Sequence, residues 1–150
     1  MKKLRDYILL PAIILLALGL GFHLLKSLGE TNLKVDQFDI IDLTDFEKKA
    51  KINQPSNEDQ YIYARQWSWG DEITLRSGRK YIVHLATGDI AHSFHLPAKA
   101  MGDPVDVLLL PGQIYRIILQ DLKPGIYPIG CTEYCGIEHN KMRTRLVVLE

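Results

Sequence analysis

Residues 131–142 read Cys-Thr-Glu-Tyr-Cys-Gly-Ile-Glu-His-Asn-Lys-Met, and they hold both cysteines of the 150-residue chain together with one histidine and one methionine. Thiolate, imidazole and thioether groups are the ligands that select copper over oxygen-loving cations. A loop of this kind has to bring several donors to one point with few spacer residues. Gly136, directly after the second cysteine, suits the tight backbone turn that this requires. The stretch therefore predicts a metal-binding loop.

Two cysteines so close together have other interpretations. A disulfide between Cys131 and Cys135 would form in an oxidising compartment. A tetrahedral zinc site fits poorly, because a methionine follows the Cys-x3-Cys-x3-His pattern. One cysteine with His139 and Met142 would make a mononuclear blue-copper centre. Two thiolates four residues apart could instead both bridge a pair of copper ions, and that arrangement needs one more imidazole.

We expect the additional imidazole to come from an upstream strand. Residues 88–97 read Gly-Asp-Ile-Ala-His-Ser-Phe-His-Leu-Pro and offer His92 and His95. The tripeptide His-Ser-Phe at 92–94, followed by Cys-x-Glu-x-Cys-Gly-x-x-His-x-x-Met, resembles the CuA domain of cytochrome c oxidase subunit II. The resemblance runs from about Tyr61 to Leu149.

The resemblance implies a dinuclear copper centre, CuA, and a ligand at each defining position of the motif. His95 lies three residues after His92, on the opposite face of a strand, so we expect it to have a supporting or packing role. The resemblance also implies that the Glu133 carboxylate reaches a magnesium ion at the contact with subunit I, which would supply the other magnesium ligands. The implied copper ligands are His92, Cys131, the backbone carbonyl of Glu133, Cys135, His139 and Met142.

The segment Gln-Trp-Ser-Trp at 66–69 resembles the aromatic segment of subunit II at which electrons arrive from cytochrome c. Trp67 matches the position of the receiving tryptophan, and Trp69 is expected to pack in a core or an interface. In a strand, both rings would project to one face because they flank Ser68. Acidic residues that could form a rim for a basic cytochrome stand at positions 71, 72, 89, 103 and 106.

The composition suits one compact domain with a small addition, since 47% of the residues are hydrophobic and 24% are charged. The formal net charge is zero, but the charges are unevenly placed. The first 26 residues carry four basic side chains and one acid, whereas the remainder carries 14 basic and 17 acidic side chains. A mildly acidic domain gives no indication of nucleic-acid binding and favours a basic partner.

The N-terminal region predicts a membrane anchor. Nineteen residues from Tyr7 to Leu25 carry no formal charge, and as a helix they would span roughly 28 Å, close to the ~30 Å hydrocarbon core of a bilayer. The alternative is a cleaved signal peptide, but the run exceeds the usual ~7–15 apolar residues and no small-x-small cleavage site follows. Lys2, Lys3 and Arg5 predict a cytoplasmic N-terminus. The domain would then lie on the periplasmic or extracellular side of the cell (inner, plasma) membrane.

Short β-rich runs separated by proline and glycine predict a mainly β fold, a cupredoxin-like Greek-key sandwich or barrel preceded by one transmembrane helix. We expect an anchor over 1–29, a linker over 30–59 with a short helix, and the CuA domain over 60–150. Residues 44–47, Thr-Asp-Phe-Glu, predict a capping box that opens this helix. The expected strands cover residues 61–69, 72–75, 80–86, 92–96, 105–110, 113–120, 125–129 and 143–149.

The resemblance implies the electron-transfer subunit II of a membrane haem-copper terminal oxidase. Such a chain accepts electrons from cytochrome c at CuA and passes them to haem in subunit I, which reduces oxygen and pumps protons. No catalytic residue for oxygen reduction is expected on this chain. One membrane segment and the short loop after His92 resemble the compact subunit II of B-type oxidases. The alternatives are the CuA subunit of a nitric oxide reductase, a membrane-tethered mononuclear cupredoxin, and a metal-free domain with a disulfide.

Overall fold

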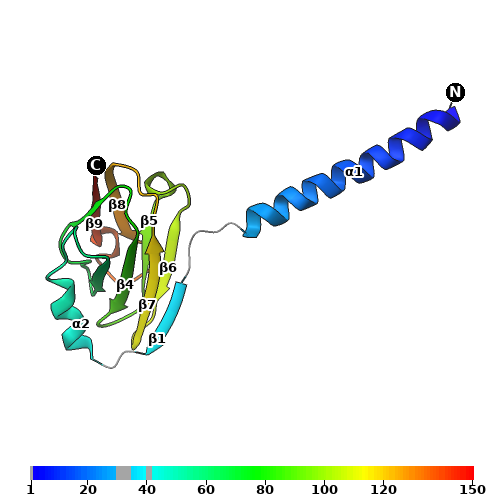
Figure 1. The fold of residues 1–150 in the computed structure, drawn as a ribbon. Helices are drawn as coiled ribbons and strands as arrows, with labels where there is room; N and C mark the ends of the chain where they lie inside the picture. The colour runs from blue at the N-terminus through cyan, green and yellow to red at the C-terminus, as the bar shows by residue number, and fades with distance from the viewer. Residues whose placement is uncertain (1, 30–34, 40–41) are drawn as a thin grey trace. The chain divides into compact units, whose positions relative to one another are not determined.

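The computed structural model describes residues 2–29, 35–39 and 42–150. The chain divides into two compact units, Met1–Asn32 and Leu33–Glu150. The first unit contains α1 (Lys2–Gly29), a single long helix (Figure 1). Within α1, Leu9–Lys26 is long and apolar enough to cross a membrane, and its side chains are exposed along its whole length. This helix agrees with the predicted membrane segment.

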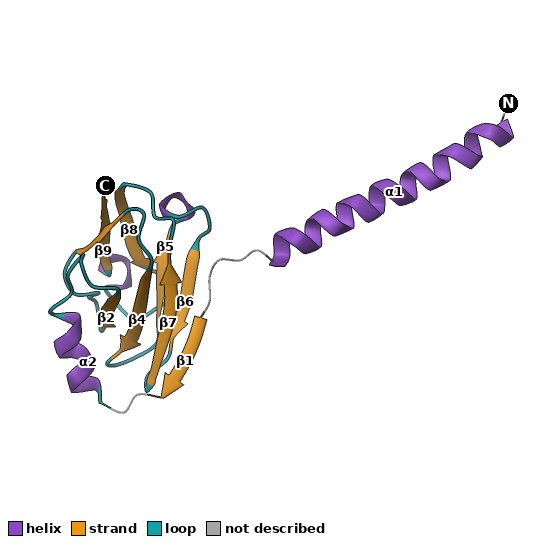
Figure 2. Ribbon diagram, viewed as in Figure 1, coloured by secondary structure: helices purple, strands orange, loops and turns teal. Residues whose placement is uncertain are grey.

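The second unit is built from two β-sheets (Figure 2). The first sheet has the strand order β1 (Val35–Asp39), β7 (Gln113–Leu119), β4 (Tyr81–Thr87) and β2 (Asp59–Ala64). The second has the order β3 (Ile73–Arg76), β9 (Arg143–Leu149), β8 (Gly125–Cys131), β5 (His92–Leu96) and β6 (Val105–Leu109). Most neighbours are antiparallel, but β2 with β4 and β3 with β9 are parallel. The observed architecture is the expected mainly β fold.

The core forms where the inner faces of the two sheets meet. Strand β6 buries Val105, Val107 and Leu109 and exposes the residues between them, as the twofold repeat of a strand requires. In the other sheet, Leu85 of β4 and Ile117 of β7 are fully buried in the same apolar cluster. Alternation of apolar and polar residues therefore determines which face of each sheet turns inward.

Strand pairing brings distant parts of the sequence together. Strand β8 lies between β5 and β9, with Phe94 opposite Cys131 and Gly130 opposite Arg143. The loop 132–142 therefore connects two paired strands, and it begins beside the first residues of β5. This loop contains a short 3-10 turn, η2 (His139–Lys141), and a second such turn, η1 (Ala98–Ala100), follows β5.

The expected linker differs from the structure, because its described parts belong to the domain. Strand β1 pairs with β7 along its whole length, and α2 (Leu43–Ala50) packs against β2. Phe46 of α2 is buried, and its ring meets that of Tyr61 edge to face at 5.4 Å. The short helix was expected, but its cap is Asp42 and not Thr44, since Asp42 Oδ1 accepts the backbone N–H groups of Thr44 and Asp45. Residues 30–34 and 40–41 of the expected linker lie outside the described residues.

The strand expected over 61–69 is also different. The observed strand, β2, covers Asp59–Ala64. The chain then turns back on itself, and Arg65 and Ser68 exchange backbone hydrogen bonds. The two tryptophans therefore lie in a loop and take different environments. Trp69 is buried, whereas Trp67 is half-buried. The other expected strands begin and end within two residues of the observed ones.

The two-sheet core predicts which leucines hold the domain together. Replacing Leu85 by alanine should lower the free energy of unfolding by about 2–5 kcal/mol, because the cavity left in the core cannot be refilled. Leu108 is 46% exposed on β6, and Leu108→Ala serves as the matched control. We expect it to change the free energy of unfolding by no more than about 0.5 kcal/mol. Urea unfolding of the full chain in detergent measures both. Equal losses at the two positions would contradict the assigned core.

Candidate metal centre

His92 is the first residue of β5, and its side chain is completely buried. Its Nδ1 atom lies 3.8 Å from Cys131 Sγ. Its Nε2 atom lies 2.9 Å from Asp89 Oδ1. In the tautomer that donates Nε2–H to this carboxylate, Nδ1 faces the sulfur with a free lone pair, as a metal-binding imidazole requires.

The two cysteines face each other across the start of the loop. Cys131 ends β8, Cys135 is fully buried, and both thiols are free. Their Sγ atoms are 3.8 Å apart. Gly136 has a φ of 113°, a backbone conformation that side chains disfavour, so the glycine permits the turn after Cys135.

The remaining predicted ligands surround these sulfurs. His139 Nδ1 is 3.5 Å and Met142 Sδ is 3.7 Å from Cys135 Sγ. The backbone oxygen of Glu133 is 3.1 Å from Cys131 Sγ. The structure thus places each of the other four predicted groups beside one of the two sulfurs. Their role as ligands remains a prediction.

The chemistry of this donor set favours a soft metal. Two thiols, two imidazole nitrogens and a thioether are suited to copper, and the hard carboxylate oxygens that calcium or magnesium would need are not among them. Of the residues that the structure describes, His92, Cys131 and Cys135 form the one compact group of potential metal ligands among histidines, cysteines and acids.

The environment of Cys135 keeps its thiol protonated when no metal is bound. Burial, together with the neighbouring Cys131 thiol, raises the pKa of Cys135 to about 11. The thiolate is the form that binds metal, so metal binding must displace this proton.

Asp89 connects the histidine to the rest of the site. Burial alone would raise the pKa of its carboxyl group, but hydrogen bonds from the Gln66 N–H, from His92 and from the Ile90 N–H outweigh burial and hold the pKa of Asp89 below its ordinary value. The group is therefore an ionised acceptor at neutral pH. From the sequence, Asp89 was predicted only as one of several acids on the surface that faces a basic cytochrome. Its hydrogen bond to His92 was missed, although a carboxylate three residues before a candidate ligand histidine could have indicated it.

The two tryptophans both approach the site. Trp67 Nε1–H donates to the backbone oxygen of Cys135 at 2.9 Å. The ring of Trp69 meets those of His92 and Phe94 edge to face, at centroid distances of 6.2 and 5.7 Å. The expectation that Trp69 packs in the core agrees with the structure.

His95 does not belong to the group formed by His92 and the two cysteines, and it bonds to an acid instead. Its Nδ1 atom is 3.2 Å from Asp106 Oδ2. The Asp106 carboxylate also accepts hydrogen bonds from the hydroxyls of Ser93 and Thr132. Each of these hydroxyl residues directly follows a predicted ligand, so Asp106 links the strands β5 and β8 beside the site.

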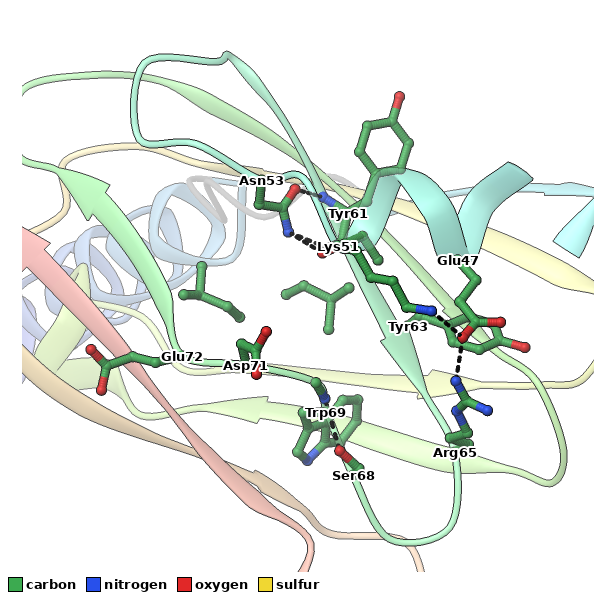
Figure 3. Close-up of a pocket in the computed structure, with 14 residues that line it drawn as sticks. Glu47, Lys51, Asn53, Tyr61, Tyr63, Arg65, Ser68, Trp69, Asp71 and Glu72 are labelled. Atoms are coloured by element: carbon green, nitrogen blue, oxygen red, sulfur yellow. Dashed lines mark hydrogen bonds and ion pairs between the residues drawn. The ribbon is translucent and has the colours of Figure 1, made fainter. Parts of the chain in front are cut away.

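A separate cavity of about 310 Å³ lies between α2 and the segment that joins β2 to β3 (Figure 3). Glu47 bridges Lys51 and Arg65 on one of its sides, and Trp69 lines it on another. None of the predicted metal ligands lines this cavity. The metal centre is instead next to a hollow of about 330 Å³ that Cys131, His139 and Met142 help to line.

Comparison with known proteins agrees with this arrangement. Residues 37–149 match the family described as "Cytochrome C oxidase subunit II, periplasmic domain". Cytochrome c oxidase subunit 2 of Thermus thermophilus is 29% identical over 92 residues, which cover 59% of this chain and 65% of that protein. The subunit 2 of Alkalihalophilus pseudofirmus is 33% identical over 92 residues, covering 61% of this chain and 26% of the relative. The chain thus spans less than two thirds of the length of these relatives.

Among solved structures, a chain of a heme-copper terminal oxidase dimer aligns with 99% of this chain and 99% of its own length, with a TM-score of 0.57 and 20% identity. That likeness supports the fold, which is mainly β, cupredoxin-like and preceded by one apolar helix. The apolar helix and the matched periplasmic domain together fit a membrane-anchored protein. Since the match covers most of the chain, this protein belongs to the cytochrome c oxidase subunit II family.

Proposed function

We propose that this chain is the electron-accepting subunit of a haem-copper terminal oxidase and that it holds a dinuclear copper centre, CuA. The observation that carries the proposal is the pair of free thiols 3.8 Å apart, with an imidazole nitrogen beside each. His92 Nδ1 accompanies Cys131 and His139 Nδ1 accompanies Cys135. His92 and His139 would each add an imidazole nitrogen to the pair of thiolates that holds the copper.

The residues fit such a centre. The Cys131 and Cys135 thiolates would hold the copper, since their sulfur atoms are close enough to be ligands of the same ion. Met142 and the Glu133 backbone oxygen then complete the two ends of the donor set. Bound copper would supply one-electron transfer. The role of the protein is to keep the ligands in the same arrangement in both oxidation states, and the paired strands β5 and β8 favour this.

The exposed tip of the ligand loop is the surface on which we propose that a c-type cytochrome docks. Ile137 is 90% exposed and Tyr134 is 74% exposed, and both belong to the loop that carries the ligands. Trp67 lies beneath this loop, hydrogen-bonded to Cys135. A cytochrome bound to these apolar side chains would lie close to the two sulfurs. Trp67 would then be the residue that receives the electron. The mildly acidic domain suits a basic donor.

The remaining assignments belong to the assembled oxidase. We propose that the acceptor is haem in subunit I, that oxygen reduction and proton pumping occur there, and that this chain has no catalytic residue. The Glu133 side chain is exposed, so it is accessible for a magnesium ion shared with subunit I. Helix α1 would anchor the chain in the cell membrane, with a cytoplasmic N-terminus and the domain on the periplasmic side.

Copper content tests the dinuclear centre. The full chain, reduced and loaded with copper in detergent, should bind two copper ions. Replacing Cys131 or Cys135 by serine should leave at most one, because the shared sulfur is lost. Tyr134→Phe is the matched control in the same loop and should keep both. One copper ion in the wild-type chain would indicate a mononuclear cupredoxin, and none would indicate a structural domain.

Protons should compete with copper at this centre. Because the pKa of Cys135 is raised to about 11, its thiol is protonated throughout the neutral range, and its contribution to copper affinity grows as pH rises toward that pKa. For this thiol alone we expect about a tenfold gain per pH unit between roughly pH 6 and pH 8. Competition with a copper(I) chelator measures the affinity. A constant affinity over this range would show that Cys135 is not a ligand.

Electron delivery should depend on the loop tip. Ile137→Ser should slow the second-order reduction of the copper-loaded chain by reduced cytochrome c about tenfold, since an apolar contact at the centre of an interface is lost. Ile126 is 63% exposed on β8, toward the end of the strand opposite to Cys131, and Ile126→Ser is the matched control. Stopped-flow absorbance follows the reaction. Equal effects at both positions would argue against docking at the tip.

A further inference from the structure

Asp89 binds two different parts of the protein with its two carboxylate oxygens. Oδ1 lies 2.9 Å from His92 Nε2, and Oδ2 accepts the backbone N–H of Gln66 at 2.6 Å. Oδ1 also accepts the Ile90 N–H at 2.7 Å. One ionised group therefore fixes both the strand histidine and the start of the Gln66–Trp67 segment.

The same segment holds the ligand loop from its other side. Gln66 Nε2–H donates to the Cys135 backbone oxygen at 2.8 Å, and Trp67 Nε1–H donates to the same oxygen at 2.9 Å. A carbonyl oxygen has two lone pairs, and both are used here. Side chains that are 68 and 69 positions away in the sequence thus fix the backbone at the buried cysteine.

The contact between segment and loop is close. A Cβ atom on Gly136 would lie 3.1 Å from Gln66 Nε2 and 3.2 Å from Trp67 Cζ2. The absence of a side chain at Gly136 therefore allows the loop to rest directly on these two residues. The two hydrogen bonds oppose a shift of the loop away from the segment.

The segment is itself held at both ends. Arg65 and Ser68 exchange backbone hydrogen bonds around it. The Arg65 side chain pairs with Glu47 of α2 (Figure 3). Trp69, which follows, is 2% exposed and packs against His92. Residues 66 and 67 are thus presented from a fixed turn and not from a mobile loop.

We propose that Asp89, Gln66 and Trp67 form a clamp that positions the two halves of the metal centre relative to each other. The inference rests on the proposed copper centre. One half is His92 on β5, and the other is Cys135 in the loop, and the clamp joins them through a continuous series of hydrogen bonds. Trp67 is then a positioning residue as well as the proposed receiver of electrons.

The clamp makes a specific prediction about coupling, because Asp89 is bonded to the Gln66 backbone N–H, whereas Cys135 is bonded to the Gln66 side-chain amide. Asp89→Asn keeps the shape of the side chain but has one acceptor oxygen, so it cannot serve both His92 and the Gln66 N–H. We expect copper affinity to fall about 10–100-fold. Gln66→Met removes one donor to Cys135 at the far end, for which we expect a several-fold loss. Both changes interrupt the same series of hydrogen bonds. The loss of copper affinity in the double variant should therefore be smaller than the product of the losses in the two single variants.

A spectroscopic measurement separates positioning from general stability. In the copper-loaded full chain, the hyperfine coupling of the His92 nitrogen should change in Gln66→Met and in Trp67→Phe, although neither residue touches His92. Asp71→Asn is the matched control, since Asp71 is an exposed acid on the same connection between β2 and β3. It should alter neither the affinity nor the coupling.

The outcomes are distinct. If the wild-type chain does not take up two copper ions, the proposed function fails and the clamp fails with it. If the wild type loads but the double variant equals the product of the single losses within about twofold, or the His92 coupling is unchanged in Gln66→Met, the clamp alone is overturned. If Asp89→Asn does not fold, as judged by circular dichroism, the couplings in Gln66→Met and Trp67→Phe decide in the same way.

Discussion

The pairing of β8 between β5 and β9 is the constraint on which the candidate metal centre depends. Backbone hydrogen bonds place Phe94 opposite Cys131 and Gly130 opposite Arg143. These two pairings set the first cysteine beside the strand histidine and close the loop that carries the other donors. Because a register shift by one residue would turn every side chain to the opposite face, the same pairing that buries the core also fixes the ligands.

The metal centre is continuous with the hydrophobic core. Cys135 and Met142 are fully buried and belong to the same apolar cluster as Leu85 and Ile117. Burial of Cys135 raises the pKa of its thiol, so the thiol stays protonated until a metal ion displaces the proton. It also requires that the polar groups at the site have partners, and Asp89 and the Cys135 carbonyl supply them. The hydrogen bonds around the site therefore follow from its position in the core.

The sequence predicted most strands and proposed a set of candidate ligands, because both depend on local signals. Thiols, an imidazole and a thioether within twelve residues have a chemical meaning that needs no structure, and alternating apolar residues mark the strands. The conformation of residues 65–69 could not be predicted from such local signals. Their apolar and aromatic character suits a strand, but the backbone turns at Arg65 because Trp69 packs against His92 and Phe94. The link from Asp89 to Cys135 through Gln66 joins residues far apart in the chain, and no local pattern encodes it.

The central claim is that the two thiols bridge two copper ions that share one electron hole. Electron paramagnetic resonance of the copper-loaded full chain, partly oxidised in detergent, tests it most directly. The account predicts a hyperfine pattern from one unpaired electron divided equally between two copper nuclei. A pattern from a single copper nucleus would contradict it, because the two sulfurs would then not be shared.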